Sequence, residues 1–448
     1  MNPAVFETLN AEREGHLPPE AWVQPGIFSA AAGSNSAIIL GPSGSGKTAL
    51  RLHITHNAAA HALCIPWQPS LPAEQQSAQA LSYAMQQQTL PACSEARLPW
   101  LLQQWSQVQA AEEWVQVSLL DFWQHYRPAN YRLLLGKLRS QTAAETSPRL
   151  QTWLEQAPAY AVLEEQAPPI EVIALLTEAL QALGLSGCWL LVDGVEPWLD
   201  AHSSTLEAAL QGLRSSLALF EQKGVTVKLF LPDALESKVL ATSGVQRRRL
   251  DVLPLTWNTE TLTDLVQKRL ALARDQPTAT LSEWFDTELL HQWLKRYGGL
   301  QPRGWLEIMR PLVNALCAQQ PPRALDAAAM QNIFQQHPPR LRLDLVKRRV
   351  YLGYGEVQGI QPAGFQILAL LYERHGELCE REEVYYRGHE GLPTVLRPGD
   401  SGYLYPKEYT GSLDTALWRL RQALEPNPET PIYLLTERNK GLRLKTHG

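Results

Sequence analysis

Short apolar runs recur in the first part of the chain and predict the strands of a buried sheet. They cover residues 36–40, 61–67, 188–193, 225–231 and 250–255. The run at 188–193 has no polar interruption before its final aspartate, which is typical of a strand covered on both faces in a parallel sheet. Segments with helical spacing lie between several of the runs, so the pattern predicts an α/β core with a parallel sheet.

Two longer stretches have the spacing of helices. Residues 71–169 are rich in Ala, Gln, Leu and Trp and show no strand-like alternation, so we expect a helical insertion in the core. Its tryptophans are expected to fill core volume, with a ligand-stacking surface as the alternative. Residues 259–273 and 281–297 are amphipathic, and a third helix is expected from residue 302 to 316; together they predict a helical lid over 257–337.

The pattern changes again after Pro338 and Pro339, which make a plausible linker. Beyond them, short alternating stretches are mixed with amphipathic helices, so we expect a separate α+β domain over 338–448. A long loop at 388–411 precedes its last helix. The expected elements are a hairpin at 341–352, helices at 362–375, 381–387 and 412–424, and a second hairpin at 431–445.

Composition agrees with several globular domains. The chain has 448 residues, of which 45% are hydrophobic and 19% charged, so we expect residues 1–33 as an arm, 34–256 as the core, and the lid and C-terminal domain after it. The five cysteines form no C-x-x-C pair, which favours reduced thiols in a cytosol over a structural zinc site. No signal peptide or membrane span is evident, so we expect a cytoplasmic protein without a membrane partner.

The first predicted strand leads into the chemistry-bearing motif Gly41-x-x-x-x-Gly46-Lys47-Thr48. Glycines permit left-handed backbone and let N–H groups approach phosphate oxygens, while a lysine and a helix N-terminus attract a polyanion. A threonine hydroxyl here is placed to ligate Mg²⁺. A flexible turn, the alternative, has no need of Gly-Lys-Thr at its end. We therefore expect ATP and Mg²⁺ to bind here. The expected nucleotide contacts are Gly41, Ser43, Gly44, Ser45, Gly46, Lys47, Thr48 and Ala49.

Three further positions are candidates for the same site. Asp193 ends a buried strand and, with Thr48, is the candidate Mg²⁺ ligand; a simple Asp-Gly turn is the alternative. Glu196 is a candidate for orienting an attacking water, or else lies in a solvent-facing loop. Arg248, within the run 247–249, could supply a positive charge to a neighbouring subunit's γ-phosphate, the alternative being a solvated charge cluster.

The element Gly298-Gly-Leu-Gln-Pro-Arg303 resembles the lid of AAA-type and STAND-type P-loop ATPases, where an arginine reaches back to the nucleotide. The resemblance covers about residues 2–335 and implies that Arg303 senses the nucleotide. Many such ATPases carry a polar γ-phosphate sensor at the tip of the strand at 225–231. Here the tip reads Leu231-Pro232-Asp233, and proline donates no N–H. We therefore expect slow hydrolysis, if any, and use of the site as a switch.

Residues 341–445 resemble the winged-helix effector domain of OmpR/PhoB-class bacterial regulators. The match rests on Leu417, Leu420, Arg421 and Leu424 in the third helix and on Thr436, Arg438, Gly441, Arg443 and Leu444 in the wing. The resemblance implies a bacterial, double-stranded-DNA-binding domain whose third helix enters the major groove. It makes Thr415, Arg419 and Gln422 candidates for reading bases, and Arg421, Arg438, Lys440 and Arg443 candidates for phosphate contact.

Two features of this domain keep a protein-docking alternative open. Trp418 is bulky for a groove-facing position, and Leu442 stands where the family usually has tyrosine. Residues 338–448 carry 16 Lys+Arg against 14 Asp+Glu, a balance of +2, while the remaining residues carry 24 against 31, or −7. This modest asymmetry permits a nucleic-acid surface without establishing one.

Together these features predict an ATP-binding, STAND-like switch that regulates through a DNA-binding winged helix, with self-association on ATP binding. One alternative is an Orc/Cdc6-like or transposition-type ATPase that recruits a partner on DNA. Another is a defence or signalling ATPase whose winged helix binds a protein effector.

Overall fold

The computed structural model divides the chain into two compact units. One unit, which we call the sheet unit, is Gln24–Thr256, and the second unit combines Met1–Val23 with Trp257–Gly448. The boundary at 256 is the predicted start of the lid, whereas the predicted arm at 1–33 is divided between the units. The residues described are 4–7, 11, 21–67, 105–112, 114–115, 169–200, 204–207, 209–210, 222–240, 251–319, 321–437 and 440–447.

The sheet unit contains five parallel strands, which confirms the predicted α/β core. The order across the sheet is β2-β3-β4-β1-β5, with β1 hydrogen-bonded to β4 on one side and β5 on the other. Strands β1, β3 and β4 are buried along their whole length, as their apolar sequences require. The strands are β1 (Ala37–Leu40), β2 (Leu63–Trp67), β3 (Cys188–Val192), β4 (Val225–Leu231) and β5 (Asp251–Pro254).

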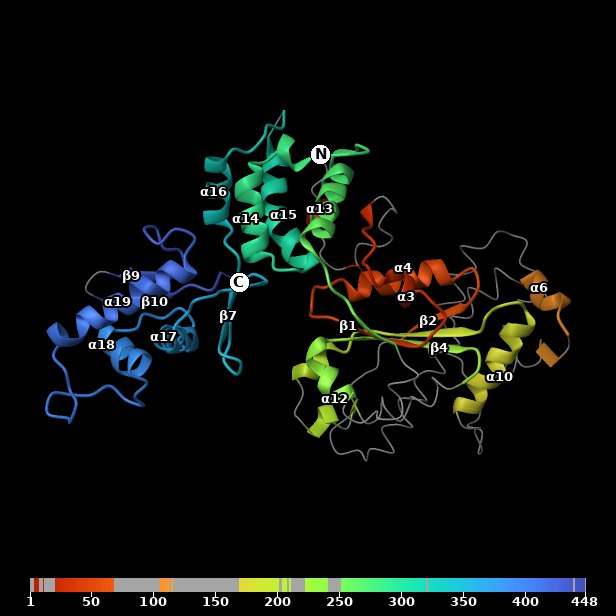
Figure 1. Ribbon diagram of the computed structural model, residues 1–448, viewed down its shortest axis with the longest axis horizontal. Coiled ribbons are helices and arrows are strands. Elements are labelled where there is room, and N and C mark those ends of the chain that lie inside the picture. The colour runs from red at the N-terminus through yellow and green to blue at the C-terminus, as the bar shows by residue number, and fades with distance from the viewer. Residues whose placement is uncertain are drawn as a thin grey trace, which may run out of the picture. The chain divides into compact units, whose positions relative to one another are not determined.

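Helices cover both faces of this sheet (Figure 1). Helix α4 (Lys47–Ala58) lies on one face, and α10 (Pro169–Ala182) lies on the other, where its Leu176 and Leu180 belong to the same buried cluster as Ile38 of β1. Because all five strands are parallel, the segments after β1, β3 and β4 leave the sheet at the same edge. The shorter helices of the unit are α3 (Phe28–Ala31), α6 (Trp105–Ala110), η2 (Glu196–Asp200), η4 (Asp233–Leu235) and α12 (Glu236–Leu240).

Most of the predicted insertion at 71–169 lies outside the described residues. Only 105–112, 114–115 and Pro169 of that stretch are described, with α6 and buried Val108 and Val115 among them.

A buried lysine fixes the segment that enters β1. Lys228 of β4 is fully buried, and its ammonium donates to the carbonyl oxygens of Gly33, at 2.8 Å, and Asn35. Burial lowers the pKa of Lys228 to about 8, and the Asp251 carboxylate opposes this shift. The two hydrogen bonds tie the start of β1 to β4 and so help to fix the strand that leads into the following loop.

The first half of the second unit is a bundle of four helices, α13 (Thr259–Arg274), α14 (Thr287–Tyr297), α15 (Pro302–Ala318) and α16 (Ala327–Gln336), with α1 (Ala4–Glu7) beside α13 and α15. Three of the four helices confirm predicted ones, and α16 was missed. Its signals are local: Asp326 accepts a hydrogen bond from Ala329 N at 2.8 Å as an N-cap, and Met330 and Phe334 are buried one turn apart.

The C-terminal segment, residues 338–448, has the predicted order of two small antiparallel sheets and three helices. One sheet has the order β6-β7-β8 and the other pairs β9 with β10. The elements are β6 (Leu341–Asp344), β7 (Arg349–Leu352), β8 (Gly355–Glu356), α17 (Pro362–Glu373), α18 (Arg381–Glu383) with the π-helical turn η7 (Val384–His389), α19 (Pro406–Leu424), β9 (Leu434–Glu437) and β10 (Gly441–Leu444).

The last helix is longer than predicted, and the loop before it is shorter. Helix α19 begins at Pro406 rather than at residue 412. Proline suits the first turn, and the Glu408 carboxylate accepts from Tyr405 N at 2.6 Å, so this end is well capped. Gly411, which suggested a loop, is an ordinary helical residue with open space around it. The predicted loop at 388–411 therefore ends at Tyr405.

The helical bundle and the C-terminal segment share one hydrophobic core and a close backbone joint. Tyr354 N donates to Tyr297 O at 2.8 Å, which ties the β7–β8 turn to the end of α14. A Cβ atom at Gly355 would lie 1.8 Å from Arg296 O, so only glycine allows this approach. We refer to this contact as the joint. No described helix of either unit is long and apolar enough to cross a membrane.

We expect Gly355→Ala to destabilise the second unit. The added methyl group would collide with the Arg296 carbonyl, so either the joint opens or the backbone shifts, at a cost of about 3 kcal/mol. Gly411→Ala is the matched control, because α19 leaves open space there and alanine favours a helix by about 1 kcal/mol. Denaturant unfolding of both variants measures the difference. Equal midpoints for the two variants would contradict the joint as described.

Candidate functional site

The loop between β1 and α4 has the conformation that its glycines suggest. Gly44 and Gly46 have φ of 87° and 91°, in the left-handed region, and Gly46 is the N-cap of α4. At Gly41 a Cβ atom would lie 2.6 Å from Ser45 Oγ. The glycines are therefore needed for the path of the loop as well as for any ligand.

The start of α4 presents a group of backbone donors. None of the described residues accepts a hydrogen bond from the N–H groups of Gly44, Gly46, Lys47, Thr48 or Ala49. The first N–H groups of a helix have no partner within it, and the helix dipole adds positive potential at the same point. Five such donors, from the end of the loop and the first turn of a twelve-residue helix, fit the oxygens of a polyphosphate.

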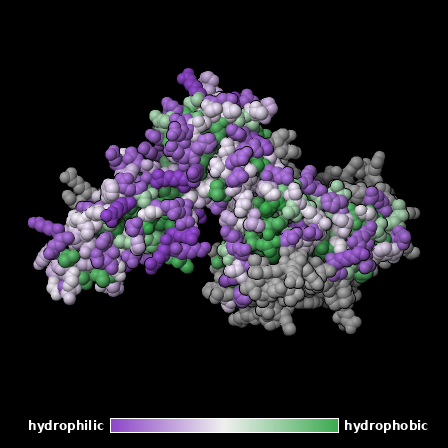
Figure 2. Space-filling model, viewed as in Figure 1, coloured by the Kyte–Doolittle hydropathy of each residue, from purple (hydrophilic) through white to green (hydrophobic). Residues whose placement is uncertain are grey.

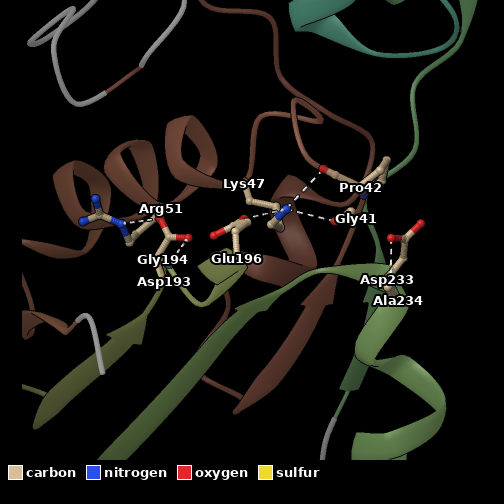
Figure 3. Close-up of polar contacts among 9 residues, drawn as sticks. All are labelled: Gly41, Pro42, Lys47, Arg51, Asp193, Gly194, Glu196, Asp233 and Ala234. Atoms are coloured by element: carbon tan, nitrogen blue, oxygen red, sulfur yellow. Dashed lines mark hydrogen bonds and ion pairs between the residues drawn. The ribbon is translucent and has the colours of Figure 1, made fainter. Parts of the chain in front are cut away.

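Lys47 is buried at the centre of this loop, with 4% of its surface exposed. Its ammonium donates to Gly41 O at 2.9 Å and Pro42 O at 3.1 Å, and it lies 3.2 Å from the Glu196 carboxylate (Figure 3). Glu196 begins the 3₁₀ turn η2 after β3. The structure therefore brings two predicted site residues, 149 positions apart, into an ion pair across neighbouring parts of the sheet edge.

Asp193, directly after β3, accepts hydrogen bonds at both carboxylate oxygens. Its Oδ2 accepts from Arg51 Nε at 3.0 Å and its Oδ1 from Gly194 N at 2.9 Å (Figure 3). Both side chains of the Arg51–Asp193 pair are less than a tenth exposed. Arg51 was not predicted, although it lies one turn after Lys47 on α4, a spacing that puts both residues on one helix face.

The residue types at this edge fit ATP and Mg²⁺. The loop donors and Lys47 match phosphate oxygens, while the Thr48 hydroxyl and the Asp193 carboxylate are the oxygen ligands that Mg²⁺ prefers. Each Asp193 oxygen accepts one of these hydrogen bonds and keeps a further lone pair, so the carboxylate can ligate Mg²⁺ directly or through a water. Within the described ranges, no group of three His, Cys, Asp or Glu residues forms any other metal site.

The strand tip at Asp233 and the two remaining candidate residues, Arg248 and Arg303, lie in different places. Asp233, after Pro232 at the end of β4, lies at the same edge, where its carboxylate accepts from Ala234 N at 2.9 Å (Figure 3). Arg248 lies outside the described residues. Arg303 belongs to the second unit, where it neighbours Tyr354 and Glu307, so its role as a nucleotide sensor stays a prediction.

The outward face of α19 confirms the predicted amphipathic pattern. Leu413, Leu417, Leu420 and Leu424 are buried, whereas Thr415, Arg419 and Gln422 are exposed. Trp418, on the same outward face, is 60% exposed. Figure 2 shows mostly hydrophilic side chains on the visible face of the C-terminal segment.

Two of the arginines predicted to contact phosphate are used inside the domain. Arg421 donates to Leu434 O at 3.3 Å and to Thr436 Oγ1 at 2.6 Å, which ties α19 to β9. Burial lowers the pKa of its guanidinium, although the group stays charged. Arg443 pairs with Glu437 at 2.7 Å. Lys440 is exposed in the β9–β10 turn, and Arg438 lies outside the described residues.

Comparison with known proteins gives no family for this chain. Neither a protein-family model nor any curated protein sequence matches it. The chemistry of the site is therefore argued from its residues and their geometry.

We expect Asp193→Ala to cost about 3–5 kcal/mol of stability, because it removes the carboxylate from an ion pair that is less than a tenth exposed. The double variant Arg51→Met with Asp193→Ala should recover most of this loss. A double-mutant cycle from denaturant unfolding measures the coupling. Asp264→Ala is the control, since the Asp264–Lys268 pair on α13 is about two-fifths exposed and worth less than about 1 kcal/mol. Additive losses in the Arg51–Asp193 cycle would rule out the coupling.

Proposed function

We propose that the sheet unit binds ATP with Mg²⁺ and that the nucleotide state governs binding of double-stranded DNA by the C-terminal segment. One observation carries the nucleotide part of this proposal: loop amides with no acceptor among the described residues, a buried lysine and two carboxylates converge on one edge of a parallel sheet. Loops at the carboxyl edge of such sheets are where ligands bind in α/β folds. The sequence Gly41-x-x-x-x-Gly46-Lys47-Thr48 supports polyphosphate as the ligand.

The contacts of Lys47 suggest how a phosphate would be received. Its ammonium rests on two loop carbonyls and the Glu196 carboxylate, all of which a phosphate oxygen could replace. The Glu196 carboxylate is 37% exposed and free to turn away from Lys47. In that position it could accept a proton from a water near the terminal phosphate. When bound, Mg²⁺ would neutralise phosphate charge, held by Thr48 and, directly or through water, by Asp193.

Several features favour a slow switch over a fast enzyme. Pro232 has no N–H to offer at the tip of β4, and the Asp193 carboxylate is held by Arg51 in a buried pair. A ligand that displaces such contacts can shift the protein between two arrangements. The size of the shift is set by the difference between its affinities for the two arrangements. This agrees with the resemblance to STAND-type ATPases, in which binding rather than turnover carries the signal.

The DNA part of the proposal is supported by the exposed face of α19 and by the turn between β9 and β10. Arg419 and Lys440 are exposed, and neither forms an ion pair with any described residue. Such free cations can release counterions from DNA, and the order of elements resembles the OmpR/PhoB winged helix.

A second function, contact with a protein effector, is favoured by the composition of the same face. Lys407 and Arg419 on α19 are balanced by Glu408 and Asp414, so its exposed charges sum to zero. Trp418 is 60% exposed between them. Tryptophan is enriched at the centres of protein interfaces, where it is buried by the partner.

We expect Lys47→Ala to weaken binding of a fluorescent ATP analogue at least tenfold, because the variant loses a charge-assisted contact to phosphate. Lys223→Ala is the control, since Lys223 is exposed in the turn that precedes β4, at the opposite edge of the sheet. Fluorescence anisotropy with and without Mg²⁺ measures both affinities. Unchanged affinity of the Lys47 variant would exclude this loop as the nucleotide site.

We expect the full chain to bind mixed-sequence duplex DNA with an affinity that falls with salt and changes when ATP is added. Lys440→Ala should reduce the slope of log K against log salt by about one, as for one lost phosphate contact. Lys347→Ala, in the turn between β6 and β7, is the control and should leave the slope unchanged. The protein effector would be favoured instead by two results together: no salt-dependent DNA binding, and recovery of a protein partner by the full chain but not by the Trp418→Ala variant.

A further inference from the structure

A cavity of about 760 Å³ lies inside the second unit, where the helical bundle meets the C-terminal segment. Its walls come from α14, α15 and α16, from the linker at 338–340, and from the β7–β8 turn. The cavity therefore sits beside the joint and touches both parts of the unit. Its volume is in the range of sites that bind small organic molecules, and the proposed nucleotide site shares no residue with it.

One side of the cavity is apolar and aromatic. Trp293, Tyr297 and Phe334 line it, and the Phe334 ring is packed against the other two with centroid separations of 4.5 and 5.0 Å. Ile308 and Leu312 of α15 continue the same wall. These side chains are nearly buried already, so they are held in place by the core and offer a preformed surface to an aromatic or aliphatic body.

The polar side of the cavity carries an excess of positive charge. Glu307 is the one acid among the lining residues, and its carboxylate accepts from Tyr354 Oη at 3.3 Å. Burial raises the pKa of Glu307, while Arg310, Arg303 and Arg342 oppose this shift, which places all three near the carboxylate. Of these three arginines only Arg310 lines the cavity, and Arg340 lines it too, so the lining carries two guanidinium groups and one carboxylate, a balance of +1 with the histidines neutral.

The two guanidinium groups that line the cavity are open to a further anionic partner. Neither Arg310 nor Arg340 forms an ion pair with any residue in the described part of the chain, although Arg310 acts electrostatically on Glu307. His337 and His447 also line the cavity. A guanidinium group binds a carboxylate or phosphate with two parallel hydrogen bonds, so an anionic ligand would complete this side of the cavity.

We propose that this cavity binds a small amphipathic organic anion, with an aromatic or aliphatic body against Trp293 and Phe334 and a carboxylate or phosphate group between Arg310 and Arg340. A molecule bound there contacts the helical bundle and the C-terminal segment together, and stabilises their present arrangement. The inference does not depend on the proposed ATP or DNA binding. It supplies a route by which a metabolite could act on the C-terminal segment.

Fluorescence titration of the full chain tests the site with two probes that share a body. One is 8-anilinonaphthalene-1-sulfonate, an aromatic anion, and the other is the neutral N-phenyl-1-naphthylamine. We expect the anion to bind at one site per chain. The double variant Arg310→Glu with Arg340→Glu should bind the anion at least tenfold more weakly, whereas its affinity for the neutral probe should change less than twofold. Asn314→Trp, an exposed lining position on α15, should weaken both probes by filling the cavity.

Arg397→Glu is the matched charge control, because Arg397 is exposed in the loop before α19 and does not line the cavity; it should leave both affinities unchanged. Circular dichroism and melting temperature show whether each variant is folded, and Ala315→Trp replaces Asn314→Trp if the latter unfolds. Unchanged binding of the anion in the filled and charge-reversed variants would overturn the site. If charge reversal weakened the binding of both probes equally, the assignment of the ligand as an anion would be wrong.

Discussion

The second unit depends on a backbone-to-backbone contact that only glycines permit. Tyr354 N reaches Tyr297 O, and a Cβ at Gly304 or Gly355 would lie 2.2 or 1.8 Å from a carbonyl oxygen. Arg296 extends the contact by donating to Ala423 O at the end of α19, at 3.1 Å. Because one of these bonds joins backbone to backbone and Arg296 adds a side-chain bond, the bundle and the C-terminal segment have little freedom to move separately without breaking hydrogen bonds.

The same contact gives a packing reason for the glycines of the element at 298–303. Its sequence resembles a nucleotide-sensing lid, yet in the structure Gly299 accepts from Trp305 Nε1 at 2.8 Å and sits against the Tyr354 backbone. Arg303 neighbours Tyr354 in the same region. The glycines of an element that resembles a nucleotide-sensing lid are thus required here by packing.

Much of the sheet and part of the site could be predicted because they rest on local rules. Apolar runs marked all five strands, most clearly β1 and β3, which are apolar and buried along their whole length, and the loop after β1 is defined by its own glycines. Arg51 was missed because its partner is 142 residues away, and no local pattern pairs them. The start of α19 was missed because Gly411 outweighed the capping by Glu408. The cavity could not be predicted, since it exists only where three helices, a linker and a turn meet.

The buried Arg51–Asp193 pair connects the proposed metal site with the proposed phosphate site. Asp193 is the candidate Mg²⁺ ligand, and its Oδ2 accepts from Arg51 Nε at 3.0 Å. Arg51 lies one helical turn from Lys47, within the positive field of the same helix end, and a polyphosphate is a group that could contact both. A metal at Asp193 would compete with Arg51 for the carboxylate, whereas a polyphosphate would offer Arg51 a second anion. In the proposed site, each ligand would therefore bind better with the other than alone.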